Sequence, residues 1–183
     1  GRECLPDIRN AEQLENGHWE IQTPVGFEGR LVWQPTSEAY TNAQNQYGLS
    51  KIAEESVALH LGRRYEIPTV AMRYSIVQGA RQSFYNAYSG ACRVFCLSFH
   101  QGIDPAIFED GMQIRDFVNI SDVVDANLLV LENEAANYQK FHVGGDKPIT
   151  VSEFASAVAN AYQRTNYEPR PSGKYRYGDT WLL

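Results

Sequence analysis

Residues 47–79 restrict the fold most, because a helical pattern there runs directly into a buried strand. Apolar residues recur at helical spacing in the first part, and the segment from Gly62 to Pro68 ends the helix; the recurring residues are Leu49, Ile52, Ala53, Val57 and Leu61. The next segment, "TVAMRYSIV" (residues 69–77), is β-branched and mostly apolar, as strands buried in a sheet are, and Gly79 closes it. A helix followed by a buried strand is half of a βαβ unit, so the chain is predicted to be an α/β protein with a parallel sheet.

Further helices and strands are predicted on both sides of this stretch. Residues 1–46 have no sustained period and are predicted to be a loop or insertion, with one short strand at "GRLVW". Ser89 is placed to cap a helix that runs through "ACRVFCLSF" to Gly102. The Asp-Gly pair at 110–111 lies between two extended runs, which predicts a β-hairpin.

The last third of the chain carries two helix starts and one strand. Ser121 is predicted to cap the helix "DVVDANLLVLE", and the strand "KFHVGG" follows it. Thr150 and Glu153 have the spacing of a capping box before the helix "VSEFASAVANAYQR". The tail "SGKYRYGDTWLL" has no periodic apolar pattern and is expected to be a loop.

Charge and apolar run length exclude two classes of partner. The formal net charge is −6 and the sixteen Lys and Arg residues are spread along the chain, so no basic patch for nucleic acid is predicted. The longest apolar runs, such as "NLLVL", are far shorter than a bilayer span, so no membrane partner is expected. Three cysteines are too few and too unevenly placed for a disulfide framework, which fits a cytoplasmic location.

Tyr47 and Lys51 form the first candidate for chemistry. At positions i and i+4 their side chains share one face of the predicted helix. A lysine ammonium close to a phenol favours the phenolate, and a phenolate can take a proton from a sugar hydroxyl while a hydride leaves the same carbon. The same spacing also arises by chance between an ordinary tyrosine and a surface lysine. The pair by itself therefore leaves both interpretations open.

Cys92, Cys96 and His100 invite a metal interpretation, because they lie four residues apart on one predicted helix. At a rise of about 1.5 Å per residue, the outer two are about 12 Å apart along the axis, too far to bind one ion. Buried core positions are the usual place for free cysteines. No metal site is predicted.

Three motifs that follow one another in this chain resemble the extended short-chain dehydrogenase/reductase family, the NAD-dependent nucleotide-sugar epimerases and dehydratases. The motifs are "YGLSK", "MRYSIVQG" and "EDGMQIRDFVNISDVVDANLLVLE". The family pattern has Tyr-x-x-x-Lys, "LRYFNVYG" and "EDGxxxRDFVxVxDVAxAxxLALE" in the same order. The resemblance covers about residues 30–180, and the third motif is the most specific of the three.

Within the family, the sequence is most similar to the dTDP-L-rhamnose 4-epimerase-like group. The segment "RQSFYNAYSGACRVF" resembles that group's "RQSxxNxYxGxxxIF". The segment "AEQLENGHWEIQTP" resembles an insertion that these enzymes carry before the catalytic tyrosine. That insertion often contains paired cysteines typical of a zinc ribbon, but here only Cys4 is present, so the resemblance adds no metal site.

The resemblance implies a role for five residues. Tyr47 would be the catalytic acid/base, and Lys51 would be its charged partner and a ribose contact, so that both also bind NAD. Tyr74 would lie near the nicotinamide of the same cofactor. Arg115 would meet the substrate diphosphate, where a guanidinium fork suits paired phosphate oxygens, and Asn86 would help to hold the sugar nucleotide.

The activity that the resemblance implies is epimerisation of a dTDP- or UDP-sugar through a 4-keto intermediate. A 4,6-dehydratase or a reductase of the same family, or a catalytically inactive truncated remnant, are the alternatives. Members of the family often dimerise through helices around the Tyr-Lys helix, so a homodimer is implied as well.

The implied fold is part of a Rossmann-type doubly wound parallel sheet with part of a small α/β substrate-binding domain. Residues 1–46 are assigned to the insertion, 47–79 and 117–132 to the C-terminal half of the NAD-binding domain, and 80–116 and 133–183 to a discontinuous, truncated substrate-binding domain. The family's G-x-x-G-x-x-G fingerprint is absent, and Ile76 replaces the asparagine of "RYFN". We therefore expect the chain to be the later half of an enzyme.

Overall fold

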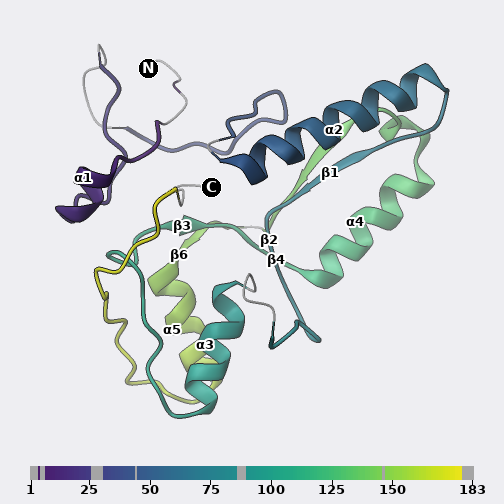
Figure 1. Ribbon diagram of the computed structural model, residues 1–183. Coiled ribbons are helices and arrows are strands. Elements are labelled where there is room, and N and C mark those ends of the chain that lie inside the picture. Colours follow the sequence, from purple (N-terminus) through teal and green to yellow (C-terminus); the bar gives the residue numbers. More distant parts are fainter. Residues whose placement is uncertain are drawn as a thin grey trace. The chain divides into compact units, whose positions relative to one another are not determined.

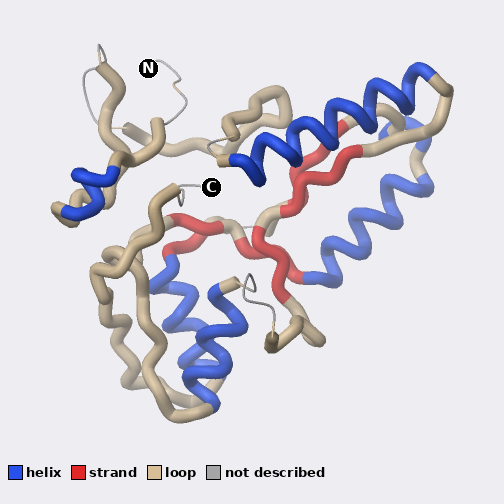
Figure 2. Tube along the Cα trace, in the orientation of Figure 1, coloured by secondary structure: helices blue, strands red, loops and turns tan. Residues whose placement is uncertain are grey.

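The computed structural model of the protein describes residues 4, 7–25, 31–43, 45–85, 90–145 and 147–178 (Figures 1 and 2). Helices and strands alternate along most of the described chain. In order they are α1 (Ala11–Glu15), α2 (Gln46–Arg64), β1 (Ala71–Tyr74), β2 (Ile76–Gln78), α3 (Ala91–His100), β3 (Ile114–Arg115), β4 (Phe117–Asn119), α4 (Ile120–Glu132), the 3₁₀ turn η1 (Glu134–Ala136), β5 (Lys140–Val143), β6 (Ile149–Thr150) and α5 (Val151–Ala161).

The chain forms two compact units, and each is discontinuous in sequence. Unit 1 comprises Gly1–Trp33, Ala80–Asp116 and Lys147–Leu183, and unit 2 comprises Gln34–Gly79 and Phe117–Asp146. The chain passes between the units at residues 33/34, 79/80, 116/117 and 146/147. Each unit is described separately below.

Unit 2 is built on parallel strand pairs, which confirms the predicted α/β class with a parallel sheet. Strand β1 pairs with β5, from Ala71 opposite Lys140 to Tyr74 opposite Val143, and β2 pairs with β4. The segment "TVAMRYSIV" was predicted to be one strand, but it divides at Ser75 into β1 and β2. The two parts divide because each pairs with a different partner strand.

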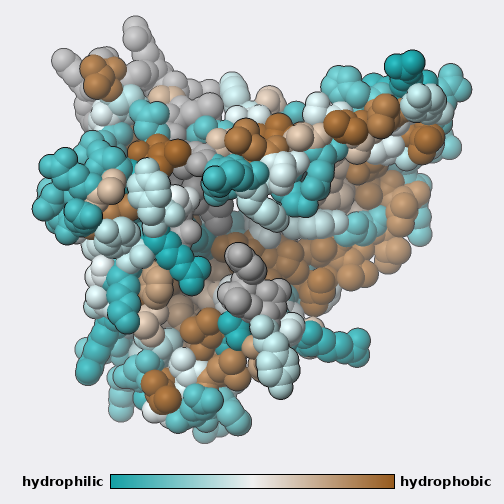
Figure 3. Space-filling view, viewed as in Figure 1, coloured by the Kyte–Doolittle hydropathy of each residue, from teal (hydrophilic) through white to brown (hydrophobic). Residues whose placement is uncertain are grey.

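Helix α2 contacts the rest of unit 2 through one face only. Leu59 and Gly62 are buried, and at 100° per residue Ile52 and Glu55 lie on the same side of the helix. Three of the residues that recur at helical spacing, Leu49, Val57 and Leu61, lie on the other side, where 59%, 57% and 47% of their surface is exposed. Figure 3 shows hydrophobic residues on the surface along α2 and also over α4.

Gly62 permits the close approach of α2 to the turn before β1. A Cβ atom at this position would lie 2.3 Å from Thr69 Oγ1 and 3.0 Å from the Ile67 carbonyl oxygen. A Gly-to-Ala change in an open helix interior stabilises by about 1 kcal/mol. We expect Gly62→Ala to do the opposite and lower the free energy of unfolding by about 1–3 kcal/mol, because the contact is overpacked.

Urea unfolding followed by circular dichroism would measure this effect. Ser56→Ala is the matched control, since Ser56 is an exposed position of the same helix and the change should be neutral or slightly stabilising. A Gly62→Ala variant as stable as the parent would show that the helix can move away from Thr69 without cost.

Unit 1 has its core between α3 and α5. Phe99 lies near its centre, with the Tyr167 ring edge-on at a centroid distance of 4.9 Å. The predicted capping box of α5 is confirmed, because the Glu153 amide donates to Thr150 Oγ1 and the Thr150 amide donates to Glu153 Oε2. The buried residues of this core are Phe95, Phe99, Ile107, Ala155, Val158 and Ala159.

Two predicted helix caps differ from the structure. Helix α4 begins at Ile120, and its N-cap is Asn119, whose side-chain oxygen accepts a hydrogen bond from the Ser121 amide. The prediction of Ser121 as the cap was therefore wrong, because an asparagine lies one residue before the first helical position. Helix α3 begins at Ala91 with Gly90 as its N-cap, and Ser89 lies outside the described residues.

The Asp-Gly turn forms, but the predicted hairpin does not. The Gly111 amide donates to the Phe108 carbonyl oxygen, which closes the turn. The chain after the turn then pairs with β6 instead of with the chain before it. The carbonyl oxygens of Gly111 and Gln113 accept hydrogen bonds from the first amides of α5, so the start of that helix takes the place of the expected partner strand. The short strand predicted at "GRLVW" is also not found, since residues 31–33 have no strand structure and residues 29–30 lie outside the described ranges.

A buried ion pair ties the N-terminal segment of unit 1 to this turn. Arg9 donates from Nη1 to Glu109 Oε2 at 2.6 Å and from Nη2 to Glu109 Oε1 at 2.9 Å. Only 4% and 3% of the two side chains is exposed. Arg9 also donates to the Trp19 carbonyl oxygen, so one guanidinium holds the chain on both sides of α1.

Candidate active site

Tyr47 and Lys51 lie on the first turns of α2, as their spacing predicts. Asn45 caps the helix by accepting a hydrogen bond of 2.8 Å from the Gly48 amide, which fixes the start of the helix beside Tyr47. The Lys51 Nζ atom lies 5.6 Å from the centroid of the Tyr47 ring. Tyr47 is 73% exposed, so its phenol is open to a molecule that approaches this end of the helix.

The ammonium of Lys51 has a second, closer partner. Lys51 Nζ donates to Glu54 Oε2 at 2.8 Å, one turn further along the helix. This hydrogen bond, with the attraction of the Glu54 carboxylate, raises the pKa of Lys51 above its ordinary value. Lys51 therefore stays charged over the whole neutral range, and its two remaining N–H groups are available to a ligand.

Tyr74 ends strand β1 on the same unit. Its hydroxyl donates a hydrogen bond of 2.9 Å to Asn127 Oδ1 on α4, and the Asn127 amide nitrogen donates to the Val123 carbonyl oxygen. Because α2 precedes β1 and runs antiparallel to it, the first turn of α2 lies at the same end of unit 2 as the last residue of β1 (Figure 1). Open α/β sheets bind ligands at this carboxyl end.

The other two predicted site residues, Arg115 and Asn86, belong to unit 1. Arg115 belongs to β3 of unit 1, is half-buried and donates to the carbonyl oxygen of its neighbour Ile114. Asn86 lies outside the described residues. The structure thus brings Tyr47, Lys51 and Tyr74 to one end of unit 2.

A cluster of charged residues holds α2 in position, and the sequence did not indicate this cluster. Arg73 on β1 donates from Nε and Nη2 to the two carboxylate oxygens of Glu55 on α2, both at 2.7 Å. These bonds lower the pKa of Glu55, and Arg73 also donates to the carbonyl oxygens of Glu38 and Tyr40. His142 on β5 accepts from Arg73 through its Nε2 atom. The cluster fixes α2, and with it the Tyr47–Lys51 pair, against the strands.

Only one signal in the sequence could have indicated this cluster. Glu55 is a carboxylate that lies between Ile52 and Leu59 on one face of the helix, and a carboxylate on a buried face needs a cation. The cation is Arg73, 18 residues further along the chain, and local spacing along the helix does not indicate it.

Cys92 and Cys96 lie on α3 with their sulfur atoms 4.0 Å apart. Burial and the neighbouring Cys96 raise the pKa of Cys92 to about 11, so this thiol is protonated at neutral pH. Among the residues that the structure describes, no three His, Cys, Asp or Glu side chains are close enough to hold a metal ion together. The described helices also include none that is long and apolar enough to cross a membrane.

Comparison with known proteins gives one consistent family. A family model described as "NAD dependent epimerase/dehydratase family" matches residues 29–144, more than half of the chain. The sequence is 30% identical over 182 residues to a dTDP-L-rhamnose 4-epimerase of Burkholderia thailandensis, and this match covers 98% of the chain and 47% of that protein. The chain spans about half the length of the curated relatives that it matches.

Solved structures of the same kind share the fold. A UDP-glucose 4-epimerase of Thermotoga maritima with UDP-glucose is similar with a TM-score of 0.67 and 29% identity, over 74% of this chain and 42% of that one. A Thermus thermophilus UDP-glucose 4-epimerase in complex with NAD has a TM-score of 0.67 and 26% identity, over 88% of this chain and 50% of that one. These similarities confirm the predicted Rossmann-type α/β class.

Proposed function

The chain belongs to the NAD dependent epimerase/dehydratase family, and we propose that it carries the acid/base part of an enzyme that epimerises a nucleotide-activated sugar at C4. The observation that carries the proposal is the exposed Tyr47 phenol with a charged Lys51 beside it, on the first turns of a helix that starts at the carboxyl end of a parallel strand. The match to a dTDP-L-rhamnose 4-epimerase over nearly the whole chain supports the same assignment, with a dTDP- or UDP-sugar as the substrate.

The residues present suit one end of an NAD molecule. Lys51 has two N–H groups left for ribose hydroxyls, and Tyr74 presents a phenol at the end of β1. The sequence has no G-x-x-G-x-x-G loop that would hold the pyrophosphate. Tyr47, Lys51 and Tyr74 would therefore hold the nicotinamide and its ribose, where bound NAD supplies an acceptor for the C4 hydrogen.

In this mechanism Tyr47 moves the proton. Its phenolate oxygen would take the proton of the C4 hydroxyl while the C4 hydrogen leaves as hydride, for which bound NAD would be the two-electron acceptor, and a 4-keto sugar would result. After the sugar turns over in its pocket, the hydrogen returns to the opposite face and Tyr47 gives the proton back. By the resemblance, Arg115 would pair with the substrate diphosphate and Asn86 would help to hold the sugar nucleotide.

The test is a product assay of the intact protein that contains this chain. With NAD present, dTDP- and UDP-sugars would be incubated with the enzyme and followed by proton NMR. An epimerase gives the C4 epimer at equilibrium with no lasting 4-keto product. A 4-keto-6-deoxy sugar that accumulates would indicate a 4,6-dehydratase instead, and consumption of reduced cofactor would indicate a reductase.

Calorimetry on the 183-residue chain tests whether this chain binds NAD tightly by itself. Because the chain has no glycine fingerprint, we expect it to bind NAD only weakly by itself. Submicromolar binding of NAD to this chain would contradict that part of the proposal. No turnover of the intact protein with any sugar nucleotide would favour an inactive remnant.

We also propose that α2 contributes to a homodimer. Leu49, Ala53, Val57 and Leu61 form an exposed stripe along the helix, spaced four residues apart. A second copy of the protein would cover this stripe with the same stripe of its own, as a two-fold interface requires.

We expect Val57→Glu to convert the dimer of the intact protein into a monomer, because a charge would be buried in an apolar contact. Sedimentation velocity would measure the change. Val32→Glu is the matched control, since Val32 is 79% exposed and does not belong to the stripe. A protein that is monomeric before any substitution would refute the proposed dimer.

A further inference from the structure

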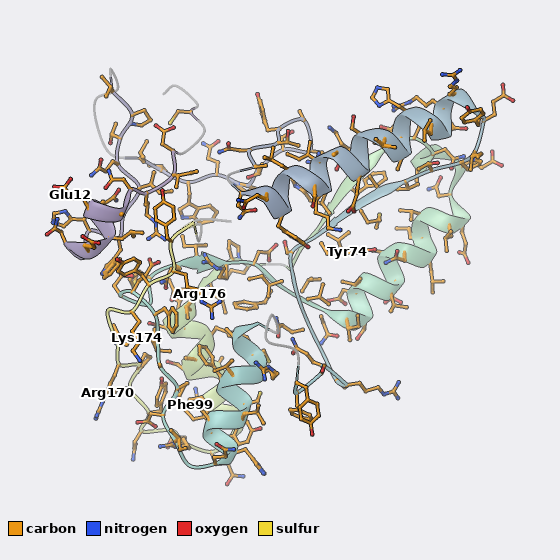
Figure 4. The ribbon with its side chains drawn as sticks, in the orientation of Figure 1. Glu12, Tyr74, Phe99, Arg170, Lys174 and Arg176 are labelled. Atoms are coloured by element: carbon orange, nitrogen blue, oxygen red, sulfur yellow. The ribbon has the colours of Figure 1, made fainter. Side chains whose placement is uncertain are left out.

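Tyr74 and Asn127 form a short chain of hydrogen bonds within unit 2. Tyr74, labelled in Figure 4, is the last residue of β1, and Asn127 lies in the second half of α4. The Tyr74 hydroxyl donates to Asn127 Oδ1 at 2.9 Å, and Asn127 Nδ2 donates to the Val123 carbonyl oxygen at 2.6 Å. The strand end and the helix are thus joined by a side chain that has a partner at both of its polar atoms.

The Val123 carbonyl sets the orientation of the Asn127 amide. A carbonyl oxygen can only accept hydrogen bonds, so the atom of Asn127 that faces it must be the NH₂ nitrogen. The Oδ1 atom at the other side of the amide therefore faces Tyr74. Because an amide oxygen also only accepts, the single hydroxyl proton of Tyr74 must point toward Asn127.

This arrangement leaves the Tyr74 oxygen as an acceptor for a ligand. Tyr74 is 44% exposed and its contact with Asn127 lies at the surface, so part of the phenol is open. A phenol has one proton to donate, and once that proton is used only the oxygen lone pairs remain. A group that binds here without breaking the Asn127 contact must offer an N–H or an O–H. A carboxylate, which only accepts, would need the Tyr74 proton to turn away from Asn127.

We propose that Asn127 is a positioning residue, which holds the Tyr74 hydroxyl as an acceptor and so favours a cofactor ring with a carboxamide over one with a carboxylate. This role rests on the proposed function, in which Tyr74 lies near the nicotinamide of NAD. The carboxamide NH₂ group of nicotinamide is a donor of the kind that the Tyr74 oxygen accepts. Nicotinic acid adenine dinucleotide has a carboxylate in its place and offers no donor there.

The experiment is calorimetry on the cofactor-free intact protein, with NAD and with nicotinic acid adenine dinucleotide. The parent should bind NAD more tightly. Asn127→Leu removes the acceptor, so the Tyr74 hydroxyl can rotate and donate to the carboxylate while its oxygen still accepts from the carboxamide. We expect this variant to keep its NAD affinity within about threefold of the parent. It should bind the nicotinic acid dinucleotide about tenfold more tightly than the parent does, because a hydrogen bond to a charged group is gained.

Two further variants assign this gain to the Tyr74 hydroxyl. In the double variant Asn127→Leu with Tyr74→Phe no hydroxyl is left to donate, so the gain for the carboxylate should disappear. Gln139→Leu is the matched control, since it replaces an exposed amide of the same unit by the same side chain and lies outside the Tyr74–Asn127 contact. It should leave both affinities unchanged. Leucine is a better helix former than asparagine, so Asn127→Leu should fold as the parent does.

Three results would overturn this role of Asn127 and leave the epimerase proposal standing. The first is a parent that binds the nicotinic acid dinucleotide at least as tightly as NAD. The second is an Asn127→Leu variant with equally weakened or unchanged affinity for both dinucleotides, which would mean that Asn127 serves only the packing of α4. The third is a gain for the carboxylate that persists in the double variant.

A fourth result would reach further. An intact protein that binds neither dinucleotide would overturn the cofactor assignment of the proposed function and, with it, the role of Asn127. The two failures are therefore distinguished by whether the parent binds NAD.

Discussion

Replacement of Tyr47 by Phe in the intact enzyme should lower the turnover of the sugar nucleotide by about 10²–10⁴-fold, which is the usual contribution of a positioned acid/base group. The change removes one oxygen from an exposed ring and leaves the Asn45 cap and the contacts of α2 intact. We expect the loss in kcat and only a small change in KM, because the proton is transferred in the transition state and not on binding.

Tyr65→Phe is the matched control for this measurement. Tyr65 is 62% exposed and follows the last residue of the same helix, so the two variants lose the same hydroxyl group at opposite ends of α2. Proton NMR of the sugar nucleotides would give turnover for both. A Tyr47→Phe enzyme with near-normal turnover would exclude Tyr47 as the acid/base group.

Substitutions of Lys51 and of its partner Glu54 test the acid/base role of Tyr47 in a second way. Lys51→Met should reduce turnover as well, because it removes the ammonium beside the Tyr47 ring. Glu54→Gln removes the carboxylate that raises the pKa of Lys51 and leaves the ammonium in place, so turnover should be kept. If both substitutions reduced turnover equally, the Lys51–Glu54 pair would matter for the helix and not for the chemistry.

The sequence predicted those features that depend on neighbours along the chain. The Tyr47–Lys51 pair, the helix α2 and the Thr150–Glu153 capping box each involve residues within one or two helical turns. Local spacing sets their geometry, and tertiary contacts leave it unchanged. The α/β class followed in the same way from a helical pattern that runs into a mostly apolar strand, whose residues are half-buried or exposed in the structure.

Features that depend on strand pairing were predicted less well. The hairpin at Asp110-Gly111 was wrong because β3 pairs with β6, about 35 residues further along the chain. The division of the predicted strand 69–77 at Ser75 reflects two different partners, β5 and β4, which local composition does not distinguish. The contact of Arg73 with His142 likewise needs the pairing of β1 with β5 to be known.

The Arg9–Glu109 pair, another contact that the sequence did not predict, should have the largest effect on stability. The partners are 100 residues apart and almost fully buried, so the loss of Arg9 leaves the buried Glu109 carboxylate without its guanidinium partner. We expect Arg9→Met to lower the free energy of unfolding by about 3–5 kcal/mol. Glu109→Gln should lower it by less, because Arg9 keeps the Trp19 carbonyl oxygen as a partner. Urea unfolding of the 183-residue chain would measure both.

The double variant Arg9→Met with Glu109→Leu distinguishes a buried-charge penalty from a loss of packing. With both charges absent, most of the stability should return, because the cost of a single variant comes mainly from the charge that is left behind. The exposed Lys51–Glu54 pair is the control, and Glu54→Gln should leave the free energy of unfolding close to that of the parent. A double variant as unstable as the singles would mean that the hydrogen bonds from Arg9 to Glu109 and to the Trp19 carbonyl, and not the balance of charge, hold the N-terminal segment on unit 1.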